Sequence, residues 1–313
     1  MKDLPLDNGN PESGIICAAN ESRFNAANLS QELTAFTAGW KDNTPLIKLL
    51  NFVAPPVAVN RRFEFKKTDN SECFLSEDDD VRAVGSAFKR VEFTGTLTNA
   101  KTLNKGLTLR IDHDDAIGED WRERYVQLIV QRLYRNELKR ALAALSENGK
   151  KIDKVWNAQS NPDADLRNML ALAANETGVY PNRILFGESA WFLRSDTYDV
   201  QQNAGAHRAA SLSLTELAQK LFVDEIQTVH ARLQTSKTKE KLLGNAVFAF
   251  YASDTIVKDE PSNIKRFYTP TDAGSPFRVY VEDHSKFSDL TVEHYSNIIV
   301  TAPNGIHQLV VKE

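Results

Sequence analysis

Residues 120–148 read DWRERYVQLIVQRLYRNELKRALAALSEN and contain neither Gly nor Pro. Apolar side chains recur through this stretch at helical spacing, namely Val126, Val130, Leu133, Tyr134, Leu138, Leu142 and Leu145. Gly149 follows as a C-terminal cap, and Glu119, Asp120 and Glu123 suit the positive N-terminal end of a helix. The stretch therefore predicts one helix about 40 Å long, and the other elements can be placed around it.

Basic residues follow another face of this predicted helix, and they are Arg124, Arg132, Arg135, Lys139 and Arg140. Such a stripe is typical of a solvated face whose cations pair with acids on the same helix, for example Glu137. Contact with nucleic acid is the alternative interpretation of the same stripe.

Before the helix, the sequence changes to a period of two from residue 57. The runs at 57–65, 91–93 and 107–111 alternate apolar and polar side chains, which indicates half-buried antiparallel strands. We therefore predict that residues 57–112 form an extended two-stranded excursion. A lone ribbon of this kind is marginal in water, so another subunit is its expected support.

The side chains of this excursion form the candidate subunit interface. Its apolar members should be buried on adjacent copies, and they are Phe63, Phe65, Phe74, Phe88 and Phe93. The acidic run Glu77, Asp78, Asp79 and Asp80 is either a solvated loop or a charge partner for a neighbouring copy's Arg82, Lys89 and Arg90. A calcium site is disfavoured, because the run lacks the ligand alternation and central Gly of an EF-hand.

The flanking segments complete the predicted layout. Roughly the first 40 residues are rich in turn formers and predict an irregular arm. A short helix then opens at Thr44-Pro45 and ends at Ala54-Pro55-Pro56. After the long helix, strands and helices alternate, with helices predicted at 162–174, 189–194 and 214–221 and strands at 183–186, 225–233 and 246–251. The last part predicts strands at 277–282, 290–293, 297–301 and 307–311, the final two joined as a hairpin by Pro303-Asn304-Gly305.

Composition narrows the class of protein. The chain has 313 residues, of which 42% are hydrophobic and 26% charged, with a formal net charge of −4. This length allows one large domain or two ordinary ones, and the charge argues against a dedicated nucleic-acid binder. No run approaches the roughly 18 apolar residues of a membrane span, and Cys17 and Cys73 lack metal-knuckle spacing. We therefore expect a soluble, reduced, intracellular globular protein without a secretory signal.

Motifs for catalysis are few. The sequence has no GxxxxGK[ST] or strand-linked GxGxxG phosphate loop, and Gly187-Glu188-Ser189-Ala190 lacks the second Gly of a nucleophile elbow. The best enzyme candidate is Asp112-His113-Asp114-Asp115, whose imidazole and carboxylates could hold the divalent metal of a hydrolase. The other histidines show no paired spacing, so we favour a polar turn whose side chains bind local backbone.

The order of these parts resembles the major capsid protein of tailed bacteriophages, which has the Hong Kong 97-type fold. Residues 36–40 (FTAGW), 50–57 (LNFVAPPV) and 61–65 (RRFEF) look like the arm and loop of phage coat proteins. Residues 182–187 (NRILFG), followed by 189–191 (SAW), are similar to the strand and helix that open the axial domain.

The resemblance implies an α+β chain with five segments. These are an N-terminal arm (1–56), an extended β-hairpin loop (57–112), a peripheral segment with the spine helix (113–155), an axial domain (156–262) and peripheral strands (263–313). Only about 55 residues precede the loop, and they are not helical in pattern apart from the short helix, which implies a separate scaffolding protein or none.

In function, the resemblance implies a major capsid protein that self-assembles into an icosahedral or prolate head shell around the phage genome. No catalytic, cofactor or metal residues are expected. The implied partners are copies of the chain in hexamers and pentamers, scaffolding, portal and decoration proteins, and double-stranded DNA held by weak, non-specific contact, with no membrane. Arg132, Arg135 and Lys139 become the candidate DNA-facing residues. The expected location is the virion, after synthesis in the host cytoplasm.

Three alternatives stay open at this point. An encapsulin-type shell protein shares the fold. A metal-dependent hydrolase would use Asp112, His113, Asp114 and Asp115, and a monomeric binding module would form no assembly.

Overall fold

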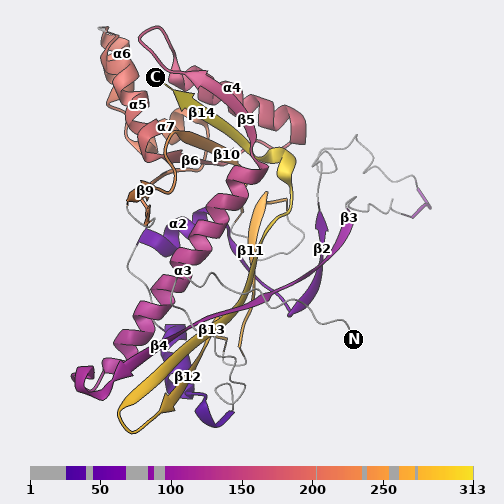
Figure 1. Cartoon of the computed structure of the whole chain (residues 1–313). Coiled ribbons are helices and arrows are strands. Elements are labelled where there is room, and N and C mark those ends of the chain that lie inside the picture. The colour runs from indigo at the N-terminus through magenta and orange to yellow at the C-terminus, as the bar shows by residue number, and fades with distance from the viewer. Residues whose placement is uncertain are drawn as a thin grey trace, which may run out of the picture.

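The computed structural model describes residues 26–39, 45–67, 84–87, 96–201, 203–234, 238–253, 261–271 and 274–312. Two five-stranded sheets share one long helix, α3 (Trp121–Asn148), which runs along both of them (Figure 1). Each sheet has its own hydrophobic core. The described residues thus form a two-lobed α+β protein, as the sequence predicts.

Helix α3 confirms the helix predicted over residues 120–148. It ends where the backbone N–H of Gly149 donates to the carbonyl of Leu145 at 2.8 Å. Its first half buries Val126 and Val130 in the core of one sheet, and its second half buries Leu142 and Leu145 in the core of the other. Among the described residues, no helix is both long and apolar enough to cross a membrane.

The first sheet, called the lower sheet from its place in Figure 1, is built around β13. Its strands in order are β1 (Pro56–Ala58), β11 (Ile264–Thr269), β13 (Phe287–Val300) and β12 (Phe277–Asp283), with β4 (Leu103–Asp112) also paired to β13. Helix α1 (Gln31–Gly39) lies beside β12, where the N–H of Ser30 donates to the carbonyl of Val279 at 3.0 Å. Leu33 of α1 enters the core between this sheet and α3.

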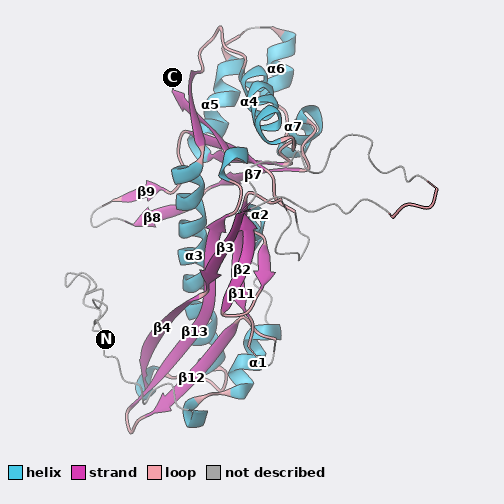
Figure 2. Ribbon diagram, turned by 90° about the vertical axis from the view of Figure 1, so that its right-hand side faces the viewer, coloured by secondary structure: helices cyan, strands magenta, loops and turns pink. Residues whose placement is uncertain are grey.

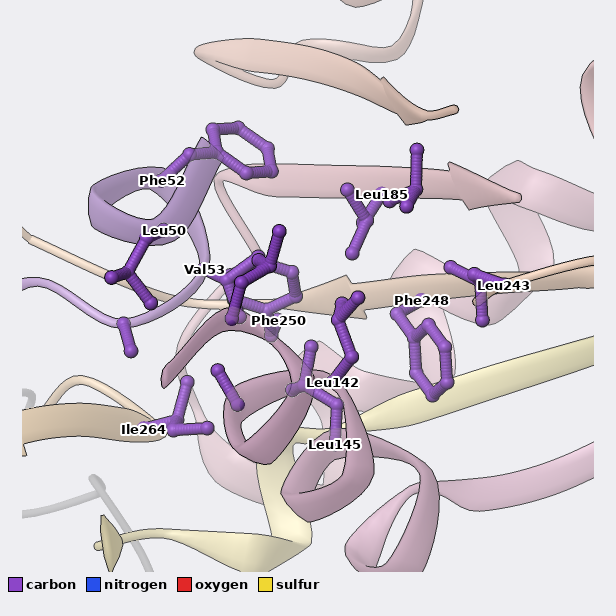
Figure 3. Packing of buried hydrophobic residues seen from close by; sticks show 14 of the residues in the cluster. Leu50, Phe52, Val53, Leu142, Leu145, Leu185, Leu243, Phe248, Phe250 and Ile264 are labelled. Atoms are coloured by element: carbon purple, nitrogen blue, oxygen red, sulfur yellow. The ribbon is translucent and has the colours of Figure 1, made fainter. Parts of the chain in front are cut away.

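The second, upper sheet is covered on both faces. Its strands in order are β5 (Lys150–Val155), β14 (His307–Lys312), β10 (Ala246–Phe250), β6 (Arg183–Gly187) and β7 (Glu225–Val229). One face packs on α2 (Pro45–Val53) and the end of α3, through Leu50, Leu142, Leu185 and Phe248 (Figure 3). The other face carries α4 (Pro162–Thr177), α5 (Glu188–Asp199) and α7 (Leu214–Leu221). Every residue of β6 and β10 is buried, which explains their continuous apolar runs.

Smaller elements complete the chain. Helix α6 (Ala204–Ala210) packs on α5, and Ala26–Asn28, His113–Asp115 and Pro303–Gly305 form short 3-10 turns. Strands β2 (Arg62–Lys67) and β3 (Thr96–Lys101) pair as an antiparallel ribbon, from Arg62 opposite Lys101 to Lys67 opposite Thr96. Strands β8 (Arg232–Gln234) and β9 (Lys239–Lys241) form a second hairpin, which projects from the body in Figure 2.

Most predicted elements are present, but the strand connections after residue 263 differ from the prediction. Residues 290–300 belong to the single strand β13 and not to two strands. The predicted hairpin at Pro303-Asn304-Gly305 is wrong, because this turn carries the chain out of the lower sheet and β14 joins the upper sheet. There β14 pairs in parallel with β5 and buries Leu309 and Val311.

The predicted segments do not coincide with the two sheets. Strand β5 ends the predicted peripheral segment 113–155 and β14 ends the predicted peripheral strands, yet both lie in the upper sheet. Strand β4 was expected in the ribbon but pairs with β13 over ten residue pairs, and the return strand of the ribbon is β3. The predicted strand 225–233 is interrupted at His230, and the predicted irregular arm contains the helix α1.

Candidate functional site

The β2–β3 ribbon lies on the lower sheet through its own aromatic residues. The ring centroids of Phe63 and Phe65 are 4.6 and 5.7 Å from that of Phe267 on β11. Phe65 is only 3% exposed within its own chain. The prediction that an adjacent copy buries it is therefore wrong. Strand β11 supplies the apolar support together with its parallel neighbour β1, because Val57 and Phe267 form one cluster with the ribbon aromatics. A contact between Phe63 and a neighbouring subunit stays a prediction.

The other candidate interface residues lie outside the described residues. They are Phe74, Glu77, Asp78, Asp79, Asp80, Arg82, Phe88, Lys89, Arg90 and Phe93. Their part in subunit contacts stays a prediction.

The outer face of α3 carries cations that the described part of the chain does not neutralise. Arg132, Arg135 and Lys139 are exposed and make no hydrogen bond or ion pair with described residues. The acid expected to pair with them, Glu137, points into the protein instead and is 1% exposed. Of the predicted stripe, Arg140 pairs with Glu137 on the same helix, as a solvated face would, whereas Arg132, Arg135 and Lys139 have no acidic partner among the described residues.

Glu137 belongs to a buried polar cluster between α3 and the lower sheet, which we call the waist cluster: Glu137, Lys105, His294 and Arg266. One carboxylate oxygen of Glu137 accepts from Lys105 Nζ at 2.7 Å and lies 3.6 Å from His294 Nε2. It also accepts from Arg140 at 2.8 Å. Lys105 comes from β4, His294 from β13 and Arg266 from β11, so the cluster connects α3 to three strands.

A cavity of about 160 Å³ adjoins the waist cluster and is lined by Glu137, Arg266 and His294. Buried polar atoms without a hydrogen-bond partner include Glu137 Oε2, His294 Nδ1 and Arg266 Nε. These atoms mix donors and acceptors, which is the arrangement that buried water satisfies.

Burial and charge act against each other in the waist cluster. Burial alone raises the pKa of the Glu137 carboxyl, but His294 and Lys105 outweigh it and hold that pKa well below its ordinary value. Burial lowers the pKa of Lys105 and of His294, and Glu137 offsets this only in part. Glu137 is therefore ionised and the His294 imidazole is neutral near pH 7.

The lowered pKa of His294 predicts a loss of stability in acid. The unfolded chain takes up the histidine proton at about pH 6.5. The folded protein resists it because burial disfavours the charged ring, and Lys105 and Arg266 add to this effect while Glu137 opposes it. The free energy of unfolding should therefore fall as the pH drops below that value. Denaturant unfolding at about pH 8 and about pH 5 should show a smaller fall for His294→Gln than for the parent chain. An identical fall in both proteins would contradict this role of His294.

The Asp112-His113-Asp114-Asp115 turn uses its side chains locally. The Asp112 carboxylate accepts from the backbone N–H of Asp114 at 3.1 Å, and His113 Nε2 is 3.0 Å from Ser288 Oγ. These are the contacts of the favoured polar turn, and they fix it against the end of β13. Within the described residues, ligand-like spacing occurs at Glu282, His284 and Asp289, where Arg110 already occupies both oxygens of Asp289.

A further polar site was missed by sequence reasoning. Glu188, the first residue of α5, accepts from Arg232 and lies 3.2 Å from Lys241 Nζ and 3.3 Å from His230 Nδ1. The hydrogen bond from Arg232 is the main reason that the pKa of Glu188 falls to about 2. This carboxylate anchors the base of the β8–β9 hairpin. The one sequence signal at this place was the near-elbow motif at residues 187–190.

Comparison with known proteins establishes the fold. The chain matches no protein-family model and no curated protein sequence. A phage-related protein from Bordetella bronchiseptica RB50 has a similar structure, with a TM-score of 0.71, 17% identity, and coverage of 90% of this chain and 96% of that protein.

Two shell proteins are also similar. The SrpI encapsulin of Synechococcus elongatus PCC 7942 has a TM-score of 0.54 at 11% identity and covers 90% of this chain and 95% of its own. The mature capsid of bacteriophage PhiM1 has a TM-score of 0.50 at 10% identity and covers 88% of this chain and 89% of its own. The chain therefore has the Hong Kong 97-type capsid fold that the sequence resemblance implies.

Proposed function

We propose that this chain is the major capsid subunit of a tailed-phage-type head and that many copies form a closed shell around the genome. The observation that carries the proposal is the similarity to the phage-related protein, which extends over 90% of this chain and includes both lobes. In this proposal the chain forms hexamers and pentamers, and the candidate interface residues of the extended loop contact neighbouring subunits. The subunit is made in the host cytoplasm and ends in the virion. Scaffolding, portal and decoration proteins would be further partners.

The described residues favour a structural role over an enzymatic one. In the best enzyme candidate, residues 112–115, the Asp112 carboxylate binds a backbone amide and the His113 ring binds a serine hydroxyl. Two surface features stand out among the described residues: the ribbon that rests on β11, and the face of α3 on which Arg132, Arg135 and Lys139 have no described partner. Surfaces of this kind suit repeated association of identical subunits.

An encapsulin-type shell is the second candidate, because the SrpI encapsulin has a TM-score of 0.54. The two functions differ in what the shell encloses. Particles purified from cells would enclose a protein cargo if the chain were an encapsulin, and nucleic acid if it were a phage coat.

Light scattering during size-exclusion chromatography tests the shared claim of assembly. We expect a species many times heavier than the 35.1 kDa subunit. A strictly monomeric protein at all concentrations would contradict both shell functions and would favour a monomeric binding module.

A further inference from the structure

We propose that the outer face of α3 is a docking surface for a helix of a partner protein, and that this helix is apolar in one half and acidic in the other. The surface, which we call the heptad face, consists of Trp121, Tyr125, Leu128, Arg132, Arg135 and Lys139. The inference goes beyond the proposed shell function and does not depend on it, because all of these residues belong to one helix of a single subunit.

The heptad face has the spacing of a helix-packing surface. Its members alternate at intervals of four and three residues, so they share one stripe about 27 Å long. Two helices that pack along each other bury residues at this spacing. The opposite stripe of α3 is already buried on the lower sheet through Val126, Val130 and Leu133. The heptad face is therefore a second packing stripe, and it is turned away from that sheet.

The first half of the heptad face borders a largely apolar hollow of about 330 Å³. The hollow is lined by Asp115, Ile117, Trp121, Arg124, Tyr125 and Leu128. Ile117 is 75% exposed and Leu128 is 56% exposed, although both side chains are large and apolar. Apolar side chains that lie together on a surface mark places where another protein binds.

The turn before α3 holds Ile117 at this hollow. Gly118 has a φ of 88°, a left-handed conformation that residues with a side chain rarely adopt. The Arg124 guanidinium donates to the carbonyl of Ile117 and ties the turn to the helix. The exposed position of Ile117 is therefore specified by its neighbours.

The second half of the heptad face is basic. Arg132, Arg135 and Lys139 are exposed and have no acidic partner among the described residues. Carboxylates on a partner would pair with these cations and fix the register of the two helices. At the other end, Glu119 and Asp120 are exposed and repel carboxylates. The acidic half of the partner therefore belongs over the cations, and its apolar half over the hollow.

A protein helix fits the heptad face better than duplex DNA or a second copy of the face. Trp, Tyr and Arg are the residue types that contribute most to protein interfaces. The phosphate backbone of DNA would contact the cations but leave Ile117 and Leu128 exposed. A parallel pair of two copies would place cations against cations. In an antiparallel pair, Arg132 of each copy would face Leu128 of the other, which buries cations without carboxylates between them.

The test uses dissociated full-length subunits and fluorescein-labelled helical peptides of about 18 residues, which match the length of the heptad face. The acidic peptide carries leucines at heptad spacing in one half and glutamates at the same spacing in the other, and both orders of the halves are made. A second peptide has lysines in place of the glutamates, and a third has serines in place of the leucines. By fluorescence anisotropy, one order of the acidic peptide should bind at least about tenfold more tightly than either of these.

The apolar half is tested with Leu128→Gln, which should weaken binding of the acidic peptide about tenfold. Leu172→Gln is the matched control, because Leu172 is also an exposed leucine on a helix, 46% exposed on α4 in the upper lobe. It should leave the affinity unchanged.

The basic half is tested with the combined Arg132→Gln and Lys139→Gln variant, which should weaken binding about fivefold and make it less sensitive to salt. The combined Lys151→Gln and Arg167→Gln variant changes the net charge equally, at exposed residues of β5 and α4, and should bind as the parent chain does. All four variants should keep the thermal unfolding midpoint of the parent chain.

Unchanged affinity in both heptad-face variants would overturn the inference, as would equal binding of the acidic and lysine peptides. Tighter binding of a mixed-sequence DNA duplex than of the acidic peptide would also overturn it. So would a dimer in light scattering that Leu128→Gln abolishes, because a second copy would then occupy the face. Since binding is measured on single subunits, none of these results bears on shell assembly, which electron microscopy tests separately.

Discussion

Replacing Glu137 by Ala is expected to lower the free energy of unfolding by about 3–5 kcal/mol, because removal of one partner leaves a buried charge without compensation. The Glu137 side chain is 2% exposed and that of Lys105 is 13% exposed. Without the carboxylate, the Lys105 ammonium keeps a hydrogen bond to Ser296 but has no negative charge beside it. Arg140 and His294 lose the same partner.

Chemical denaturation of the parent chain and the variant measures this loss. Glu147→Ala is the matched control, because Glu147 is an exposed acid on the same helix without a described ion pair, and it should change stability by no more than about 0.5 kcal/mol. A loss below about 1 kcal/mol for Glu137→Ala would show that the waist cluster does not stabilise the fold. Because the cluster connects β4, β11 and β13 to α3, a large loss would also show that it stabilises the packing of the lower sheet on the long helix.

Deleting residues 68–90 is expected to leave a folded subunit that forms no shells. The deletion removes most of the candidate interface, from Phe74 to Arg90, and keeps the described ribbon strands β2 and β3. Lys67 and Thr96 are direct partners in the ribbon, so the remaining residues 91–95 can close it as a five-residue hairpin loop. The contacts of Phe63 and Phe65 with Phe267 are untouched.

Circular dichroism and thermal unfolding should be close to those of the parent chain, whereas size-exclusion chromatography and electron microscopy should show only small species. A second variant with a Gly/Ser linker of the same length in place of residues 68–90 separates chain length from side-chain chemistry. Shells of normal size from either variant would contradict a role for this segment in assembly.

Helix α3 was predictable from the sequence because its signals are local. Nearly thirty residues without Gly or Pro, an apolar stripe and a following Gly specify the helix without any tertiary contact. Helix α4 was predictable for the same reason, since Asn161 caps its N-terminus and Gly178 adopts the left-handed conformation at its end.

Strand β13 was divided in the prediction because polar residues interrupt its apolar alternation. These residues are His294, Tyr295 and Ser296, and in the structure two of them are buried against partners on other elements. His294 lies 3.6 Å from Glu137 of α3, and Ser296 accepts a hydrogen bond from Lys105 of β4. Partners so distant in the chain cannot be identified from one sequence.

The burial of Glu137 could not be predicted either, because its main partners are also distant in the sequence. Its place between Leu133 and Ala141 on the buried stripe was a usable signal, because this i−4 and i+4 spacing puts it on the inner face of α3. The Lys105 ammonium that compensates its charge and the His294 ring beside it are 32 and 157 residues away, so the sequence alone favoured a solvent-exposed acid. The unpaired state of Arg132, Arg135 and Lys139 among the described residues is consistent with this burial.

Electron microscopy of the purified full-length chain tests the central claim, that this subunit assembles into a capsid shell, most directly. We expect closed particles of uniform size, or ring-shaped capsomers at low concentration, built from many 35.1 kDa subunits. A field of dispersed single subunits under every condition of salt and concentration would contradict it.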